Sequence, residues 1–253
     1  MNTTLYIFAS VMLISLASFV GVFGISLRED RLRKALFFLI PLAVGALLGD
    51  AFLHLYPQAL EKAESSVAVS LILLAGFVSF FVLEKYLRWH HGHAEEIANA
   101  PARAETKHLG PLVLVSDGIH NFIDGIIIGA SYLVGIEVGI ATTLAVILHE
   151  IPQEIGDFGV LIYAGYKKST ALFYNFLSAL TAVLGAGFVL MFGSLSEGFA
   201  ESAVPFAAGG FIYIASSDLI PELHKNRERK NLFYEILGIF LGVLAMYFLL
   251  FLE

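Results

Sequence analysis

The sequence contains no cysteine and few charged residues. Of its 253 residues, only 7 are proline and 15% are Asp, Glu, Lys or Arg. The absence of cysteine excludes a disulfide-stapled secreted domain, thiolate metal sites, iron–sulfur clusters and cysteine nucleophiles. The net charge of -7 argues against a nucleic acid partner. Any metal ion must therefore be bound by histidine, carboxylate and amide groups.

Apolar residues dominate the rest of the composition. They make up 58% of the chain, and the mean hydropathy is +0.80, whereas soluble proteins are about half apolar and about a quarter charged. Apolar stretches of about 20 residues cross about 30 Å of hydrocarbon. We therefore predict an all-α integral membrane protein, a single transmembrane domain over residues 1–253. Its eight predicted spans are 4–27, 35–60, 66–89, 110–134, 137–166, 169–193, 203–224 and 231–252.

Lysine and arginine predict the orientation of the spans. The connections after the first, third, fifth and seventh spans carry fourteen of the 15 basic residues, and Lys62 is the exception. By the positive-inside rule these four loops face the cytoplasm of a plasma (inner) membrane, and both termini lie outside. We expect the first span to be retained, because no basic region precedes Leu5 as it would in a signal peptide.

One connection, residues 90–109, is long enough to form a real loop, which we expect to be cytoplasmic and mobile. Its composition is that of a weak metal-collecting tract and equally that of a polar loop with incidental histidines. Its histidines are His90, His91 and His93.

Ionisable and amide side chains within the spans are concentrated in four helices. Each such charge costs about 2.5–3.5 kcal/mol on insertion scales and usually faces a cavity or a partner. With about 100° per residue, the fourth and fifth spans each present theirs on one side: Asp117, His120, Asn121 and Asp124, and His149, Glu150, Gln153, Glu154 and Asp157. The second and seventh spans add Asp50, His54, Asp218 and Glu222.

The polar stripes of the fourth and fifth spans lie at the same predicted depth. Neutral imidazole nitrogens together with carboxylate oxygens suit a borderline divalent cation such as Zn²⁺ or Fe²⁺. Pro152 frees the carbonyl of Leu148 beside His149, because proline has no N–H. Irregular backbone at membrane depth is tolerated where it lines a cavity. The sequence therefore predicts an ion site near the midplane.

The second and seventh spans form a weak internal repeat. Aligning Pro57 with Pro221 pairs His54 with Asp218, and the two spans run in opposite directions. Inverted repeats are typical of secondary transporters. His54, Asp218 and Glu222 could flank an ion path. His54 is equally explained as a hydrogen-bonded packing residue, and the two acids as the end of a span near the headgroups.

Two motifs on consecutive spans resemble the paired signatures of the ZIP family of zinc and iron transporters. They are DGIHNFIDG at 117–125 and HEIPQEIGDF at 149–158. The second resembles the HExPHExGD form of the largest metazoan subgroup and its bacterial relatives, and residues 49–57 and 209–214 are similar to that subgroup too. The resemblance implies a 3+2+3 inverted-repeat bundle, a homodimer and an elevator-like movement. It also implies a bacterial-type member without the extracellular His-rich domain.

The resemblance also implies a set of metal ligands on these two spans: His120, Asn121, Asp124, His149, Glu150 and Gln153, to which we add Glu154. One position departs from the subgroup, because Gln153 stands where the subgroup has a second histidine. An amide is a weaker ligand, so a single metal bound mainly by four of these residues is expected: His120, Asp124, His149 and Glu150. For the remaining polar residues we expect path or ligand-orienting roles: His54, Asp50, Asp117, Asp157, Asp218 and Glu222.

We therefore expect a transporter, not an enzyme, that moves Zn²⁺ toward the cytoplasm, with Fe²⁺, Mn²⁺, Co²⁺ and Cd²⁺ as further cargo. An intramembrane metalloprotease is one alternative, since His149-Glu150 begins like HExxH, but that motif needs a second histidine at position 153. A proton-coupled organic-solute carrier is the other, and it would need no metal.

Overall fold

Eight membrane-length helical segments make up the part of the chain that the structure describes. This computed structural model covers residues 3–20, 29–95, 109–193, 198–224 and 229–252. The first four segments are α1 (Thr3–Ala17) with a 3₁₀ turn (Ser18–Val20), α3 (Glu29–Gly49) continued by the π-helix η2 (Asp50–Leu55) and α4 (Tyr56–Lys62), α5 (Ser66–Glu95), and α6 (Leu109–Val134). The last four are α7 (Ile136–Tyr163), α8 (Lys168–Ala179) continued by α9 (Thr181–Phe192), α10 (Phe199–Ile214) continued by the π-helix η5 (Ala215–Leu219) and α11 (Ile220–His224), and α12 (Arg229–Leu249) with a 3₁₀ turn (Leu250–Leu252).

These segments coincide with the eight predicted spans, which confirms the all-α membrane architecture. Seven are long and apolar enough to cross a bilayer. The eighth, α7, is as long, but the polar residues near its middle lower its hydropathy. One expectation changes, because α5 continues to Glu95 and the predicted loop therefore starts later than residue 90. The histidine side chains of that tract lie outside the described residues: His90, His91 and His93.

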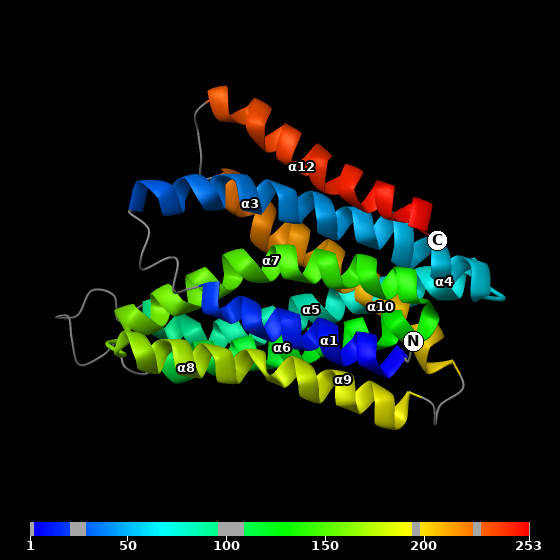
Figure 1. Ribbon diagram of the computed structural model, residues 1–253, viewed down its shortest axis with the longest axis horizontal. Coiled ribbons are helices and arrows are strands. Elements are labelled where there is room, and N and C mark those ends of the chain that lie inside the picture. Colours follow the sequence, from blue (N-terminus) through cyan, green and yellow to red (C-terminus); the bar gives the residue numbers. More distant parts are fainter. Residues whose placement is uncertain (1–2, 21–28, 96–108, 194–197, 225–228, 253) are drawn as a thin grey trace.

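Both chain ends lie at the same end of the bundle, as an even number of crossings requires (Figure 1). At the opposite end, α1, α5, α7 and α11 finish, and α3, α6, α8 and α12 begin (Figure 1). The four basic connections follow these helix ends in the sequence. Which end faces the cytoplasm stays a prediction from the positive-inside rule.

The first three and the last three segments repeat one another's packing. In their membrane-length parts, 61% of the residues of α3–α4 and 59% of those of α10–α11 are buried, against 17% for α5 and 11% for α12. The peripheral helix α12 packs along α3, and the peripheral helix α5 packs along α10. This is the arrangement expected when the second and third spans are related to the seventh and eighth by an inverted repeat.

Close glycine contacts hold both of these helix pairs together. A Cβ atom at Gly45 would overlap the backbone carbonyl of Ile239 on α12, and one at Gly209 would overlap the carbonyl of Leu73 on α5. Small residues let membrane helices approach one another in this way. The proline-anchored alignment pairs Gly45 with Gly209, so the weak sequence repeat is also a repeat of helix packing.

Both central segments change to π-helix at equivalent positions. The amide of Tyr56 donates to the carbonyl of Ala51, and the amide of Ile220 donates to that of Ala215, five residues back in each case. The next residue in each helix is a proline, which has no N–H and crowds the preceding turn. Each widened turn is therefore a consequence of its proline.

The bundle is apolar outside and polar inside. Leu71 on α5, Met191 on α9 and Phe233 on α12 are 61–67% exposed. Soluble monomers rarely expose such large apolar surfaces, whereas lipid covers them. The buried polar groups lie at the packed centre, which defines an integral multi-pass membrane protein with a polar interior.

Candidate metal centre

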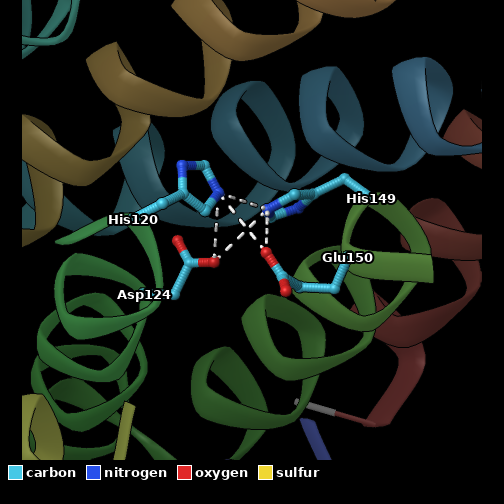
Figure 2. Close-up of side chains that lie close together, drawn as sticks. All are labelled: His120, Asp124, His149 and Glu150. Atoms are coloured by element: carbon cyan, nitrogen blue, oxygen red, sulfur yellow. Dashed lines mark hydrogen bonds and ion pairs between the residues drawn. The ribbon is translucent and has the colours of Figure 1, made fainter. Parts of the chain in front are cut away.

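Four side chains from two antiparallel helices point toward one another inside the bundle (Figure 2). His120 and Asp124 lie one turn apart on α6, so they share a face of that helix. His149 and Glu150 are consecutive on α7. Only Gly135 separates α6 from α7, and the two helices pack side by side. The short connection therefore brings the donors of the two predicted stripes together.

The donor atoms of these four residues are evenly spaced. The Nε2 atoms of His120 and His149 lie 3.3 Å apart. Asp124 Oδ2 lies 3.5 Å from the Nε2 atom of His120 and 3.3 Å from that of His149. Glu150 Oε1 lies 3.4 Å and 3.6 Å from the same two nitrogens. All four atoms lie within 4.8 Å of one another.

This spacing matches a tetrahedral zinc site. With Zn–N and Zn–O bonds of about 2.0–2.1 Å, the corners of a tetrahedron are about 3.3–3.4 Å apart. Five of the six donor–donor distances are 3.3–3.6 Å. Hydrogen bonding alone does not account for this geometry, because a neutral imidazole has a single N–H to donate. An ion the size of Zn²⁺ fits between the four atoms.

The two carboxylates of the site are fully buried. Asp124 and Glu150 are 0% exposed, and none of their four oxygens accepts a hydrogen bond from the residues that the structure describes. A buried carboxylate without a compensating positive charge or donor is costly. The centre is therefore electrostatically prepared for a cation.

Ala145 sets the tautomer of His149. The Nδ1 atom of His149 lies 3.3 Å from the carbonyl oxygen of Ala145, one turn earlier on α7. A carbonyl oxygen can only accept, so Nδ1 carries the proton and donates it. The Nε2 atom then keeps its lone pair and points it at the other three donors, as a metal-binding imidazole requires.

A cavity of about 620 Å³ connects the centre with the end of the bundle opposite the termini. His120 is 18% exposed, whereas the other three donor residues are almost completely buried. His120 and His149 both line the cavity, and His120 is the more exposed of the two. Further polar side chains line the cavity: Gln153, Asp117, Asp157, Glu84 and Glu222.

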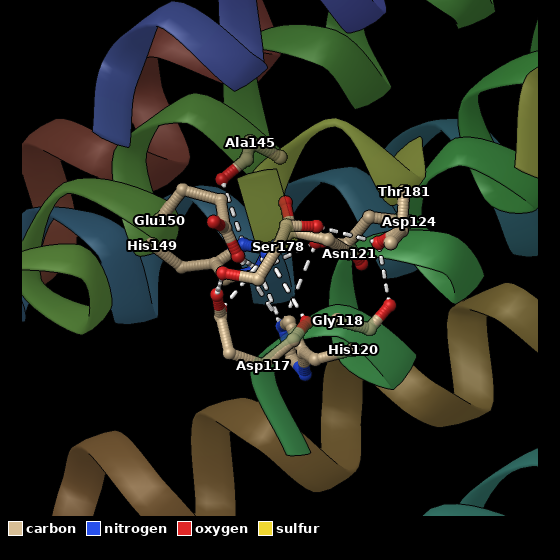
Figure 3. A network of polar contacts seen from close by, with 10 residues as sticks. All are labelled: Asp117, Gly118, His120, Asn121, Asp124, Ala145, His149, Glu150, Ser178 and Thr181. Atoms are coloured by element: carbon tan, nitrogen blue, oxygen red, sulfur yellow. Dashed lines mark hydrogen bonds and ion pairs between the residues drawn. The ribbon is translucent and has the colours of Figure 1, made fainter. Parts of the chain in front are cut away.

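A second carboxylate group adjoins the first and shares Glu150 with it. One oxygen each from Asp117, Glu150 and Glu154 lie within 4.8 Å of one another. Unlike the acids of the first group, its Asp117 is held by protein donors (Figure 3). Asn121 Nδ2 donates to Asp117 Oδ1 at 2.9 Å, and Ser178 on α8 donates to Asp117 Oδ2 at 2.5 Å.

Two predicted path residues lie away from the centre, on the second span. The Nε2 atom of His54 lies 3.0 Å from the carbonyl oxygen of Met246 on α12. This contact favours the packing role over a ligand role for His54. Asp50 is buried at the start of η2. Asp218 lies in the backbone of η5, and its side chain is outside the described residues.

Three polar residues of the sixth span contact this network and were missing from the sequence-based prediction. Asn175 on α8 donates to the carboxylate of Glu154, Ser178 donates to Asp117, and Thr181 Oγ1 lies 2.5 Å from the carbonyl oxygen of Gly118. Their signal was available, since they recur every three residues in an apolar span. They carry no ionisable group, so a prediction based on intramembrane charges does not include them.

The bundle and its polar interior define a class of protein: a multi-pass membrane protein with an inverted repeat and a histidine–carboxylate cluster of a kind that could bind a metal ion between its middle helices. Comparison with known families agrees. The model of the ZIP zinc transporter family matches residues 1–112 and 90–250, which together cover nearly the whole chain. The protein belongs to the ZIP zinc transporter family.

Individual relatives cover most of the chain as well. Zinc transporter SLC39A7 of Mus musculus is 31% identical over 332 aligned positions, which cover 98% of this chain and 70% of the relative. Zinc transporter ZIP13 of Mus musculus is 34% identical over 254 positions, 85% of this chain and 69% of the relative. Zinc transporter zipt-7.2 of Caenorhabditis elegans is 32% identical, with 83% of this chain and 57% of the relative covered.

Proposed function

We propose that the protein carries Zn²⁺ across the membrane toward the cytoplasm, one ion at a time, through the centre formed by His120, Asp124, His149 and Glu150. The observation that carries the proposal is the 3.3–3.6 Å spacing of these donor atoms, which suits the bond lengths of Zn²⁺. Membership of the ZIP zinc transporter family and the names of the relatives support zinc as the cargo. Other divalent ions that accept nitrogen and oxygen ligands, namely Fe²⁺, Mn²⁺, Co²⁺ and Cd²⁺, are secondary cargo.

The inward direction is supported by the cavity. It joins the centre to the helix ends that adjoin the four basic connections, which the positive-inside rule assigns to the cytoplasm. Buried apolar side chains pack beside the ligands; the ring of Phe211 lies 6.1 Å from that of His149. In the proposed route the ion leaves the centre through the cavity, past Asp157 and Glu222.

Neither alternative is favoured by a specific observation. A metalloprotease motif would place two histidines one turn apart on one helix with a glutamate as general base. Here the histidines come from α6 and α7, and Gln153 occupies the position of the second histidine. An organic-solute carrier would have no need for four donor atoms at tetrahedral spacing.

The test is uptake of radioactive zinc into proteoliposomes. The wild-type protein is compared with the His120→Ala/His149→Ala variant and with His224→Ala, which removes an exposed histidine at the end of α11. We expect saturable uptake by the wild type and by His224→Ala, and none by the double variant. Size-exclusion profiles in detergent check that all three proteins are folded.

Competition with the other four ions ranks the cargo in the same assay. Uptake that persists in the folded double variant would place the transport site elsewhere. If the folded wild-type protein transported none of the five ions in either orientation, the result would favour the protease or the organic-solute carrier.

A further inference from the structure

The segment α8–α9 contacts both helices that supply the metal ligands. It packs against α6 along its length and against α7 through α8. Three polar side chains face these helices: Asn175, Ser178 and Thr181. Ser178 and Thr181 contact α6, and Asn175 contacts α7. A single segment therefore bridges the two halves of the centre.

On the α6 side, the contacts lie within one turn of His120. The hydroxyl of Ser178 donates to Oδ2 of Asp117 at 2.5 Å, and Asn121 occupies the other oxygen of the same carboxylate. Thr181 Oγ1 lies 2.5 Å from the carbonyl oxygen of Gly118 (Figure 3). These contacts involve the Asp117 carboxylate, the Asn121 amide and the Gly118 carbonyl, all within three residues of His120, and none of them involves the His120 imidazole.

On the α7 side, the contact lies one turn beyond Glu150. The amide of Asn175 donates to Oε2 of Glu154 and lies 3.3 Å from the backbone carbonyl oxygen of the same residue. Asn175 and Glu154 are both 0% exposed. In a dry interior such a hydrogen bond is electrostatically stronger than at the surface. The position of α7 along α8 is therefore tied to this pair.

The bridging segment is itself rigidly joined to α6. Cβ atoms at Gly125 and Gly185 would overlap the backbone carbonyls of Ala182 and Phe122 respectively, so α6 and α9 are in backbone contact. Between α8 and α9 the helix is interrupted at Leu180.

We propose that Asn175, Ser178 and Thr181 are positioning residues that set the distance between α6 and α7 and so adapt the centre to Zn²⁺. This inference rests on the proposed function. Metal–ligand distances must be correct to about 0.2 Å, and two of the four ligands come from each helix. A looser pair of helices would accept ions with longer bonds and more ligands, such as Mn²⁺, which prefers octahedral oxygen-rich sites.

The test uses substitutions that remove one hydroxyl each. Ser178→Ala and Thr181→Val take away the contacts to α6, and Thr181→Ser retains the hydroxyl as a rescue variant. Ser131→Ala is the matched control, because Ser131 is a fully buried serine on α6 whose hydroxyl bonds only its own helix at Ile127. Zinc and manganese uptake into proteoliposomes give KM and Vmax for each protein.

We expect Ser178→Ala and Thr181→Val to raise the KM for zinc about tenfold, the lower range for removal of a group that orients a metal ligand. Their preference for Zn²⁺ over Mn²⁺ falls, and Vmax changes less than KM. Thr181→Ser and Ser131→Ala keep the wild-type KM and preference. For any variant that folds poorly, the dissociation constant for zinc is measured on its monodisperse fraction in detergent, because that constant does not depend on yield.

Two results would overturn the inference while leaving the proposed function intact. One is zinc uptake by the wild type with an unchanged KM and ion preference in both hydroxyl-free variants. The other is a loss of Vmax or thermal stability alone, equal in Thr181→Val and Thr181→Ser, which is the behaviour of a purely structural contact. Absence of zinc uptake by the wild type would instead refute the proposed function.

Discussion

Two groups of buried carboxylates lie next to each other on α6 and α7, and they differ in what faces their oxygens. Asp124 and Glu150 face two imidazole nitrogens and accept no hydrogen bond from the described residues. Asp117 and Glu154, about two turns and one turn away along the same helices, accept bonds from amide and hydroxyl groups. Similar residues on the same two helices therefore face imidazole nitrogens in one group and hydrogen-bond donors of the protein in the other.

Under the proposed function, this difference separates the acids expected to bind the cargo from those expected to hold the helices in place. A carboxylate whose oxygens already accept strong hydrogen bonds is fixed in position and offers fewer lone pairs to a metal. A buried carboxylate without such bonds depends on a cation for its stability. Burial and charge alone do not separate the two groups, since Asp117, Asp124, Glu150 and Glu154 are all at most 3% exposed.

The same Asp→Asn substitution in each group tests whether the two groups of acids differ in zinc binding. Loss of a residue that only orients a metal ligand lowers the metal affinity by about 10- to 100-fold. Asp124→Asn removes a charged ligand itself, and we therefore expect the zinc affinity to fall by more than about 100-fold. Asp117→Asn leaves the four donor atoms in place, and we expect a loss of about tenfold or less. Zinc titration of the purified proteins in detergent measures both constants.

Equal losses in the two variants would contradict the division between cargo-binding and scaffold acids. Both substitutions are nearly isosteric and lie on the same helix, so differences in packing contribute little. Circular dichroism of each protein confirms that the helical content is unchanged before the titration is interpreted.

A second, smaller effect is expected from acid. Protons and zinc compete for the imidazole nitrogens of His120 and His149, because only the neutral ring binds a metal. Lowering the pH is therefore expected to lower the zinc affinity. Titration calorimetry between about pH 7.5 and about pH 5 measures the change, and a flat profile would remove the histidines from the ligand set.

The smallest effect on transport is expected from His54, which like His149 is buried in the described part of the bundle. His54→Phe keeps a ring of similar size and removes the contact to the Met246 carbonyl. We expect the free energy of unfolding to fall by about 0.5–1.5 kcal/mol, the net worth of one hydrogen bond. The KM for zinc stays at the wild-type value, whereas the same change at His149 abolishes uptake. A raised KM for zinc in His54→Phe would instead support a role for His54 in the ion path.

Much of the fold was predictable because its signals are local. Each span is a long apolar run, and its length follows from the thickness of the hydrocarbon layer. The i, i+4 spacing of His120 and Asp124 already placed both on one face of their helix. The short connection at Gly135 required the next helix to be an antiparallel neighbour. Periodicity and connection length therefore brought the four donors to one level before any coordinates were known.

The continuation of α5 to Glu95 was not predicted, because the polar tract at its end has no apolar periodicity. Other features depended on contacts between segments that are distant in the sequence. The carbonyl partner of His54 lies on the last span, 192 residues away. The spacing of Asn175, Ser178 and Thr181 indicates that they share a face of their span, but their roles depend on which groups of α6 and α7 they contact, and the sequence of the span does not specify those partners.

The sequence alone specifies the lipid surroundings of this protein, the number and approximate limits of its spans, and the two polar stripes that carry the candidate ligands, since hydrophobic length and helical period are properties of a single segment. Only the tertiary structure decided which acids lack protein donors, which histidine is used for packing, and which helix bridges the centre. Those outcomes depend on the rotation and separation of packed helices. Close backbone contacts at residues such as Gly45, Gly125 and Gly185 fix both quantities.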